Sequence, residues 1–267
     1  MVISKLVIII LKKSEPIYHS LRKKYFKFLP TSPLGSVPLI KKQLFRLKTK
    51  VIASNFDPEI QKLLEWYNLN HYDLRDSQEA IDVACFCKFI LDTEDIEGDI
   101  LELGAEYGGF STVLGHFLKQ IKSKRKVISC DTFYGYPYED IELKATVGEK
   151  RVGRYKDLNF EDVQNRIKKY DVVDKVELIQ GKFEDTLNQK LSDRKFSIVF
   201  IDCNIYKSTK ISLEFSYPRL SNNGLVLFDE YEDTNNPYSG ETIATNEFCE
   251  EHDLKIDMTL IPHIRKI

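Results

Sequence analysis

Residues 102–111, Glu-Leu-Gly-Ala-Glu-Tyr-Gly-Gly-Phe-Ser, decide the fold expected for this chain of 267 residues. They follow a short apolar run at 99–101 and lead into a helical pattern over 112–121. This order predicts a strand, a glycine-rich turn and the start of a helix. In parallel α/β sheets such a turn is the usual place for a bound ligand, although an ordinary strand–helix connection gives the same pattern.

The residue types in this turn indicate the kind of ligand. Gly104 and Gly108 let the backbone approach a ligand, and Gly109 lets the helix pack closely. Ser111 stands at the helix start, where backbone N–H groups face the ligand. The turn is not G-x-G-x-x-G, and no Gly-Lys-Ser/Thr follows it, which disfavours a dinucleotide and a phosphate loop. With the acidic Glu102 on the strand, the pattern better suits a nucleoside joined to an amino acid, and we expect S-adenosylmethionine.

Composition and charge indicate a globular protein with a basic N-terminal arm. The chain is 42% hydrophobic and 30% charged, with a net charge of −2. Residues 1–50 carry 12 Lys or Arg and one acid, which leaves 27 bases and 40 acids for the rest. We expect a basic extension over 1–56 and a globular domain over 57–267. The arm fits contact with the acidic body or with solvent, and the alternative is an anionic membrane or partner.

The apolar and cysteine content favours a cytoplasmic protein. The apolar run at 6–11 is far shorter than the roughly 20 residues that span a bilayer, and no small-residue cleavage site follows it. The five cysteines are an odd number and lack disulfide or zinc spacing, so we expect buried, reduced thiols.

Strand and helix patterns alternate from residue 99 onward. Strands are expected at 100–103, 126–130, 176–179, 196–201, 225–228 and 255–261. Helices are expected at 59–67, 77–91, 111–121, 160–170, 208–220 and 242–252. This alternation predicts a mostly parallel sheet with helices on both faces. A long aromatic and charged loop at 131–159 fits a lid that selects the substrate.

Polar residues follow these strands, at the edge where parallel sheets bind ligands. Asp131 ends the second strand about 20 residues past the glycine turn, where an acid can bind both ribose hydroxyls; a turn or cap role is the alternative. Gly181 permits a tight turn after the third strand. Phe183 offers an apolar face to adenine, or it belongs to the core.

Three acids form the strongest group. Asp202 ends one apolar strand, and Asp229 and Glu230 end another. If these strands are neighbours, the carboxylates are close and their pKa values rise unless a cation joins them. An all-oxygen set favours Mg²⁺, Mn²⁺ or Ca²⁺. Such an ion could hold two substrate hydroxyls while Asp202 takes a proton; three separately solvated acids are the alternative.

Several ordered motifs carry a family resemblance over about residues 60–260. Besides 102–111, they are Asp-Thr-Phe-Tyr-Gly-Tyr-Pro at 131–137, Gly-Lys-Phe-Glu-Asp-Thr-Leu at 181–187, Ile-Asp-Cys-Asn-Ile-Tyr-Lys-Ser-Thr at 201–209, Tyr-Pro-Arg-Leu at 217–220 and Asp-Glu-Tyr at 229–231. With these the chain resembles the macrocin O-methyltransferase family, class I S-adenosylmethionine-dependent enzymes that methylate sugar hydroxyls of antibiotics and related glycosides.

The resemblance implies a fold and residue roles. We expect a Rossmann-like class I methyltransferase with a mostly parallel seven-stranded sheet and a helical N-terminal extension. Asp202, Asp229 and Glu230 would hold Mg²⁺, with Asp202 as base and also at the cofactor. Asn204 stands where a second aspartate is usual, and Glu230 replaces an aspartate. These two departures bear on cation affinity.

The expected function is methyl transfer from S-adenosylmethionine to a sugar hydroxyl, in a homo-oligomer. One alternative is a metal-dependent methyltransferase of a catechol-like or other small-molecule hydroxyl. Another is a cofactor-binding scaffold with weakened catalysis, which Asn204 and Glu230 keep open. Nucleic acid is disfavoured as a substrate, because the body is acidic and no Asn/Asp-Pro-Pro-Tyr-like motif is present.

Overall fold

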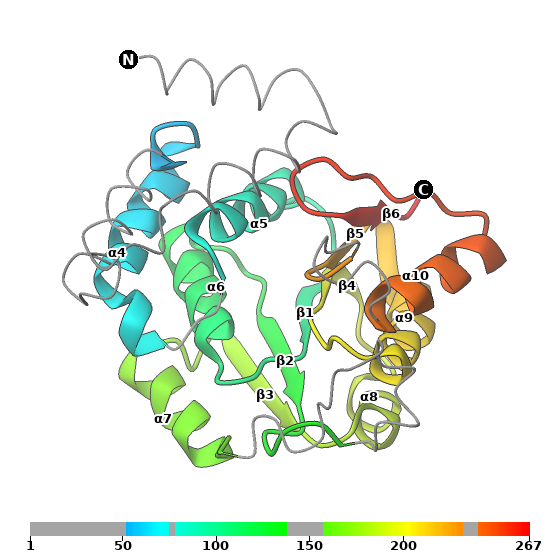
Figure 1. The fold of residues 1–267 in the computed structure, drawn as a ribbon. Helices are drawn as coiled ribbons and strands as arrows, with labels where there is room; N and C mark the ends of the chain where they lie inside the picture. Colours follow the sequence, from blue (N-terminus) through cyan, green and yellow to red (C-terminus); the bar gives the residue numbers. More distant parts are fainter. Residues whose placement is uncertain (1–51, 75–77, 138–156, 232–239) are drawn as a thin grey trace, which may run out of the picture.

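A computed structural model describes residues 52–74, 78–137, 157–231 and 240–267, and shows one sheet with helices on both faces (Figure 1). The strands are β1 (Asp99–Leu103), β2 (Val127–Asp131), β3 (Val176–Gln180), β4 (Phe196–Ile201), β5 (Leu220–Phe228) and β6 (His263–Arg265). The helices are α4 (Pro58–Leu74), α5 (Ala80–Asp92), α6 (Gly109–Gln120), α7 (Phe160–Lys169), α8 (Phe183–Leu191), α9 (Tyr206–Arg219) and α10 (Gly240–Glu251). The predicted basic arm and most of the predicted lid lie outside the described residues.

The sheet runs in the order β3-β2-β1-β4-β5-β6. Strands β1 to β5 are parallel, and β6 pairs antiparallel with β5. The chain moves outward from β1 to β3 and then returns to β4 on the other side of β1. Loops after β1 and β4 therefore diverge, and a crevice opens at the carboxyl ends of these two strands.

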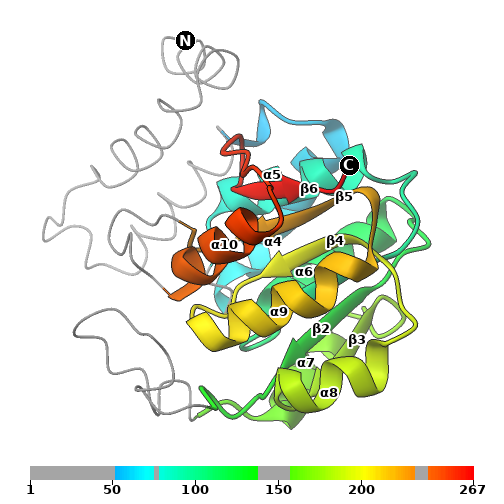
Figure 2. The same cartoon turned by 90° about the vertical axis from the view of Figure 1, so that its right-hand side faces the viewer.

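Two hydrophobic layers cover the sheet, as its alternating side chains require. Ile100, Ile198 and Leu225 face the layer that contains α4, α5 and α6. Leu101 and Val199 face the opposite layer, which contains α8, α9 and α10. The helices lie on the two sides of the sheet accordingly (Figures 1 and 2). The predicted α/β architecture is confirmed.

The C-terminal strand and the strand count differ from the prediction. The described residues form six strands rather than seven. The predicted strand at 255–261 is wrong, because β6 lies at His263–Arg265. In the predicted segment, Asp257 makes an isolated bridge to His263, and its carboxylate accepts the Thr259 N–H at 2.8 Å. This aspartate turn ends the extended run, and Leu260 has a positive φ of 59°.

Helix α8 was not predicted. No helix or strand was expected at residues 183–191, but they form a helix whose Phe183, Leu187 and Leu191 are buried. The spacing of four residues between these apolar side chains is typical of an amphipathic helix and could have predicted α8. The other elements match with shifted ends. The largest shifts are in α4, which extends to Leu74, and in β5, which starts at Leu220.

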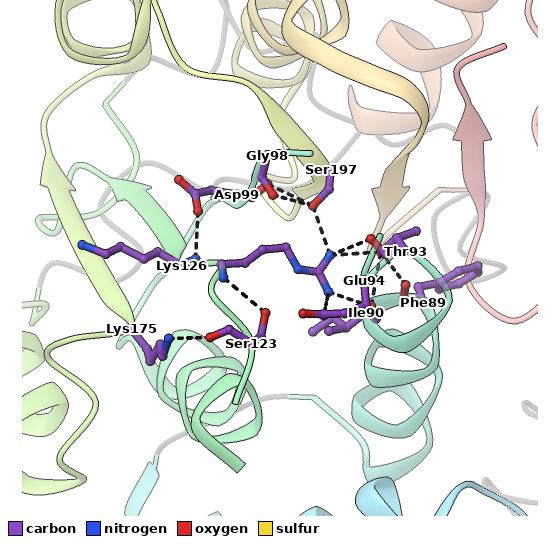
Figure 3. Close-up of polar contacts among 11 residues, drawn as sticks. Phe89, Ile90, Thr93, Glu94, Gly98, Asp99, Ser123, Lys126, Lys175 and Ser197 are labelled. Atoms are coloured by element: carbon purple, nitrogen blue, oxygen red, sulfur yellow. Dashed lines mark hydrogen bonds and ion pairs between the residues drawn. The ribbon is translucent and has the colours of Figure 1, made fainter. Parts of the chain in front are cut away.

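Arg125 ties the amino ends of the strands to α5. Its side chain is only 7% exposed, and its Nη1 donates to the Thr93 carbonyl and the Ser197 hydroxyl, both at 3.2 Å. Its Nη2 donates to the Ile90 carbonyl at 2.7 Å and forms a short ion pair with Glu94. Figure 3 shows these partners around the guanidinium group. One buried cation thus caps the C-terminal carbonyl groups of α5 and contacts β4.

All five cysteines are buried and free, as predicted. Within the described ranges, no helix is both long and apolar enough to cross a membrane.

Candidate active site

The glycine turn after β1 is pressed against the end of β4. Gly104 has a φ of +106°, and a Cβ atom there would lie 2.0 Å from the Asp202 carbonyl oxygen. The Asp202 N–H donates to the Leu103 carbonyl at 2.9 Å, which fixes the two strand ends together. Gly108, also left-handed at φ 70°, is the N-cap of α6. The strand, glycine turn and helix start that the sequence predicted are confirmed.

Glu102 and Ser111 contact each other beneath this turn. Glu102 is 1% exposed, and its carboxylate accepts hydrogen bonds from the hydroxyl of Ser129 at 2.6 Å and from that of Ser111. The pair joins β1, β2 and the first turn of α6. A buried carboxylate with two hydroxyl donors gives the turn a rigid support.

Asp131 closes the other side of the turn. One carboxylate oxygen accepts the Glu106 N–H at 3.0 Å and the other accepts the Phe133 N–H at 2.8 Å. Burial raises the pKa of Asp131, and these backbone hydrogen bonds act in the opposite direction. The acid therefore links the end of β2 to the glycine turn, and it borders the cavity.

A cavity opens at the crevice between β1 and β4. Its lining includes Gly104, Glu106, Asp131, Thr132, Gly135, Tyr136, Pro137, Leu158, Phe183, Asp202, Cys203, Asn204 and Ser208. The structure thus brings together Gly104, Asp131, Phe183 and Asp202 from the predicted cofactor residues. Phe183 also packs in the core, and its contact with adenine stays a prediction. The other predicted cofactor residues (Glu102, Gly108, Gly109, Ser111 and Gly181) are not in the lining, and their role stays a prediction.

Two of the three predicted acids meet at one amide. Gln78, just before α5, donates from Nε2 to Asp229 Oδ1 at 3.1 Å and to Asp202 Oδ2 at 3.5 Å. Strands β4 and β5 are neighbours with Ile201 beside Phe228, so the acids that follow come side by side. Burial, and then the charge of Asp229 and other acids, raises the pKa of Asp202 well above its usual range. Sequence reasoning missed Gln78, since no motif relates it to either strand.

Glu241 is a fourth acid at this site that the sequence did not single out. It lies in the first turn of α10 with 0% exposure, and its Oε1 accepts the Glu230 N–H at 2.9 Å. Burial, and then the charge of Asp229, raises its pKa, while N–H donors from Glu230 and Asn204 lower it. Acidic residues are common in the first turn of a helix, so the position of Glu241 in the sequence does not indicate a functional role.

The donor chemistry of this group suits a hard divalent cation, because every side chain offers oxygen. Among residues 52–74, 78–137, 157–231 and 240–267, however, no three His, Cys, Asp or Glu side chains are arranged as a metal-binding group. The Gln78 amide instead lies between Asp202 and Asp229. In this conformation the amide supplies the positive dipole that two adjacent carboxylates require.

The sheet order and the glycine turn at the crevice define a class I methyltransferase fold. The solved structure of the calicheamicin methyltransferase CalS11 superposes with a TM-score of 0.63, at 18% identity, over 90% of this chain and 95% of that one. The O-methyltransferase NovP superposes with a TM-score of 0.56, at 22% identity, over 70% and 78% of the two chains. The chain belongs to the macrocin O-methyltransferase (TylF) family, whose sequence profile matches residues 83–265.

Curated relatives match little more than half of this chain. An 8-demethyl-8-(2,3-dimethoxy-alpha-L-rhamnosyl)-tetracenomycin-C 4'-O-methyltransferase from Streptomyces olivaceus is 28% identical over 57% of this chain and 60% of its own length. Demethyldecarbamoylnovobiocin O-methyltransferase from Streptomyces niveus is 27% identical over 51% of this chain and 54% of its own length. The chain thus spans little more than half the length of these relatives.

Proposed function

We propose that this protein transfers the methyl group of S-adenosylmethionine to a hydroxyl oxygen of a sugar or glycoside. The observation that carries the proposal is the place of Asp202. Asp202 lines the cavity beside the glycine turn. Its carboxylate and that of Asp229 accept hydrogen bonds from the same Gln78 amide. The proposed donor site and the proposed acidic acceptor site are therefore adjacent, which supports direct transfer between two bound substrates.

For the cofactor, the cavity residues have complementary roles. Asp131 would accept the ribose hydroxyls, and Phe183 would contact adenine. Gly104, Gly108 and Gly109 would let the backbone approach the amino acid part, with Gly181 shaping the opposite turn. Glu102 and Ser111 would act beneath this site, where they hold the turn in place.

For the acceptor, we propose Asp202, Asp229 and Glu230 as ligands of Mg²⁺. The bound cation would orient the acceptor and lower the pKa of its hydroxyl. Asp202 would take the proton from the hydroxyl that the cation acidifies. Gln78 would have to leave the space between Asp202 and Asp229 when the cation enters.

The substrate class rests on the relatives. The matched protein from Streptomyces olivaceus is named as a 4'-O-methyltransferase of a rhamnosyl-tetracenomycin, and a protein from Micromonospora griseorubida, 28% identical over 52% of this chain, is named as a mycinamicin III 3''-O-methyltransferase. A methyltransferase of catechol-like hydroxyls and a cofactor-binding scaffold are the competing functions.

Calorimetry and turnover separate these functions. The full chain is titrated with S-adenosylmethionine, and S-adenosylhomocysteine formation is then measured with a panel of rhamnosides and catechols, in Mg²⁺ or in EDTA. We expect cofactor binding in both buffers and Mg²⁺-dependent turnover with a glycoside. Binding without turnover across the panel would favour the scaffold, and turnover with catechols alone would favour the second enzyme class.

Three expectations complete the proposal. We propose a cytoplasmic homo-oligomer, which light scattering and cell fractionation would test. The five free cysteines accord with a reducing compartment. Sedimentation with anionic vesicles would test membrane contact by the basic residues 1–50.

A further inference from the structure

The start of α7 packs against the glycine turn. Val163 of this helix lies so close to Gly108 that a Cβ atom on residue 108 would stand 2.6 Å from Val163 Cγ1. Val163 also forms a small buried apolar cluster with Ala105 of the turn and with Phe133. The centre of the Phe133 ring lies 5.1 Å from that of Phe160, the first residue of α7. The turn and the helix therefore share one apolar contact.

Polar side chains strengthen this contact. The hydroxyl of Tyr107, inside the glycine turn, lies 2.9 Å from both carboxylate oxygens of Asp157. Arg166 of α7 donates from Nη1 to the backbone carbonyl of Tyr107. The side-chain oxygen of Asn159 accepts the Glu161 N–H at 2.9 Å and caps the N-terminus of α7. The segment just before α7 is thus held by the glycine turn on one side and by the helix on the other.

Leu158 lies between the two residues that make these contacts, Asp157 and Asn159, and it lines the cavity at the crevice. Its side chain is only 8% exposed. The same cavity is lined by Phe183 and by Asp131. Binding cavities combine apolar walls with a few polar groups, and adenine is the largest apolar part of S-adenosylmethionine. No motif in the sequence singles out Leu158, because its place depends on how α7 packs.

We propose that Leu158 contacts the adenine of S-adenosylmethionine, and that Tyr107 is a positioning residue that places Leu158 through Asp157. The inference rests on the cofactor half of the proposed function. It gives Tyr107 a role different from that of the glycines beside it. The glycines would make room for the amino acid part of the cofactor, whereas the tyrosine ties their turn to a wall of the nucleoside part.

Calorimetry of the full chain with S-adenosylmethionine tests the proposal. Leu158→Ala removes the apolar side chain, and Leu158→Met keeps a comparable volume. Tyr107→Phe removes the hydroxyl but keeps the ring. Tyr170→Phe is the matched control, because the Tyr170 hydroxyl contacts another aspartate, Asp73, at the opposite end of α7. The melting temperature of each variant reports whether it is folded.

We expect Leu158→Ala to weaken S-adenosylmethionine binding by at least about tenfold, and Leu158→Met by less than about twofold. The competitor 5'-methylthioadenosine keeps the adenine but lacks the amino acid part, and it should lose the same factor in Leu158→Ala. Tyr107→Phe should weaken cofactor binding by about threefold to tenfold. It should change binding by less than about twofold when residue 158 is already alanine, because both effects pass through one side chain. Tyr170→Phe should match the wild type.

Equal losses for Tyr107→Phe in both backgrounds would show that Tyr107 supports the fold in general, and would overturn its positioning role. Wild-type affinity in Leu158→Ala would overturn the adenine contact, and so would a loss for S-adenosylmethionine that 5'-methylthioadenosine does not share. If the wild-type protein itself does not bind S-adenosylmethionine, the proposed function fails and the inference fails with it. Binding by the wild type that neither substitution changes rejects the inference alone.

Discussion

Gly104 faces the backbone carbonyl of Asp202 so closely that a Cβ atom at residue 104 would stand 2.0 Å from the carbonyl oxygen. The glycine turn and the first candidate acid are thus parts of one packed unit. Neither segment can shift without the other, because both are backbone and are joined by the Asp202 N–H bond to Leu103.

Gly104→Ala should abolish S-adenosylmethionine binding and lower the melting temperature. The added methyl group collides with backbone, and the φ of +106° is itself unfavourable for alanine. Gly108→Ala is the matched comparison, since its Cβ would meet the side-chain Cγ1 of Val163 at 2.6 Å, which can move. We expect the Gly108 variant to retain weakened binding in calorimetry. Equal binding by both variants would contradict the packed unit.

Asp202→Asn should stabilise the cation-free protein at pH 8. The pKa of Asp202 is raised in the folded state from an ordinary value of 3.8. The unfolded chain therefore releases this proton first, and the wild type loses stability as the pH rises through the interval between the two pKa values. The advantage of the variant should grow across that interval and vanish near pH 4. Urea unfolding in EDTA at several pH values checks this.

Asp257→Asn provides a control of opposite sign. Burial raises the pKa of Asp257, but the Thr259 hydrogen bonds outweigh it, and the net pKa is below 3.8. The ionised Asp257 carboxylate therefore stabilises the folded protein above the pKa of the unfolded chain. This stabilisation disappears as the pH falls through the lowered pKa of the folded state. Asp257→Asn should therefore be less stable than the wild type at pH 8. An identical pH trend for both variants would refute the assigned directions.

Gln78→Leu should make the protein more dependent on Mg²⁺. Leucine preserves the volume but removes the amide that contacts Asp202 and Asp229, at a cost of about 1–3 kcal/mol without cation. Saturating Mg²⁺ should then raise the melting temperature more in the variant than in the wild type. Gln61→Leu, which removes an amide bound to the Phe56 carbonyl, should leave the effect of Mg²⁺ unchanged.

Arg125→Ala should lower the free energy of unfolding by about 3–5 kcal/mol, because it leaves the buried carbonyl groups of Ile90 and Thr93 without their donor. Arg194→Ala is the control, since Arg194 forms ion pairs with Glu177 and Asp99 while 38% of its side chain is exposed. Its loss should cost less than about 1 kcal/mol. Denaturant unfolding of both variants measures the difference, and similar losses would argue against the role of Arg125.

The parts of the fold that follow local patterns were predictable. Strand β4 is apolar at every position except Ser197, and its predicted bounds match the structure. The glycine turn was equally clear, because glycine spacing reports a backbone requirement directly. The strand at 255–261 failed because alternation alone does not reveal the competing turn at Asp257.

The candidate site was predictable only where its residues end strands. Asp202 and Asp229 met that condition, and the β4–β5 pairing brings them together. Gln78 lies just before α5 and Glu241 lies in α10, and these helices cover opposite faces of the sheet, so both contacts depend on how α5 and α10 pack. Such long-range contacts leave no local trace in a single sequence.

Arg125 and the acid group lie at opposite ends of the same strands. The carboxyl ends collect like charges that oppose folding, whereas the amino ends are held by a cation with several hydrogen bonds. The acid group and the Arg125 contacts are therefore separate parts of the sheet. Substitutions in the acid group leave the Arg125 hydrogen bonds intact, so they need not reduce the stability that Arg125 provides.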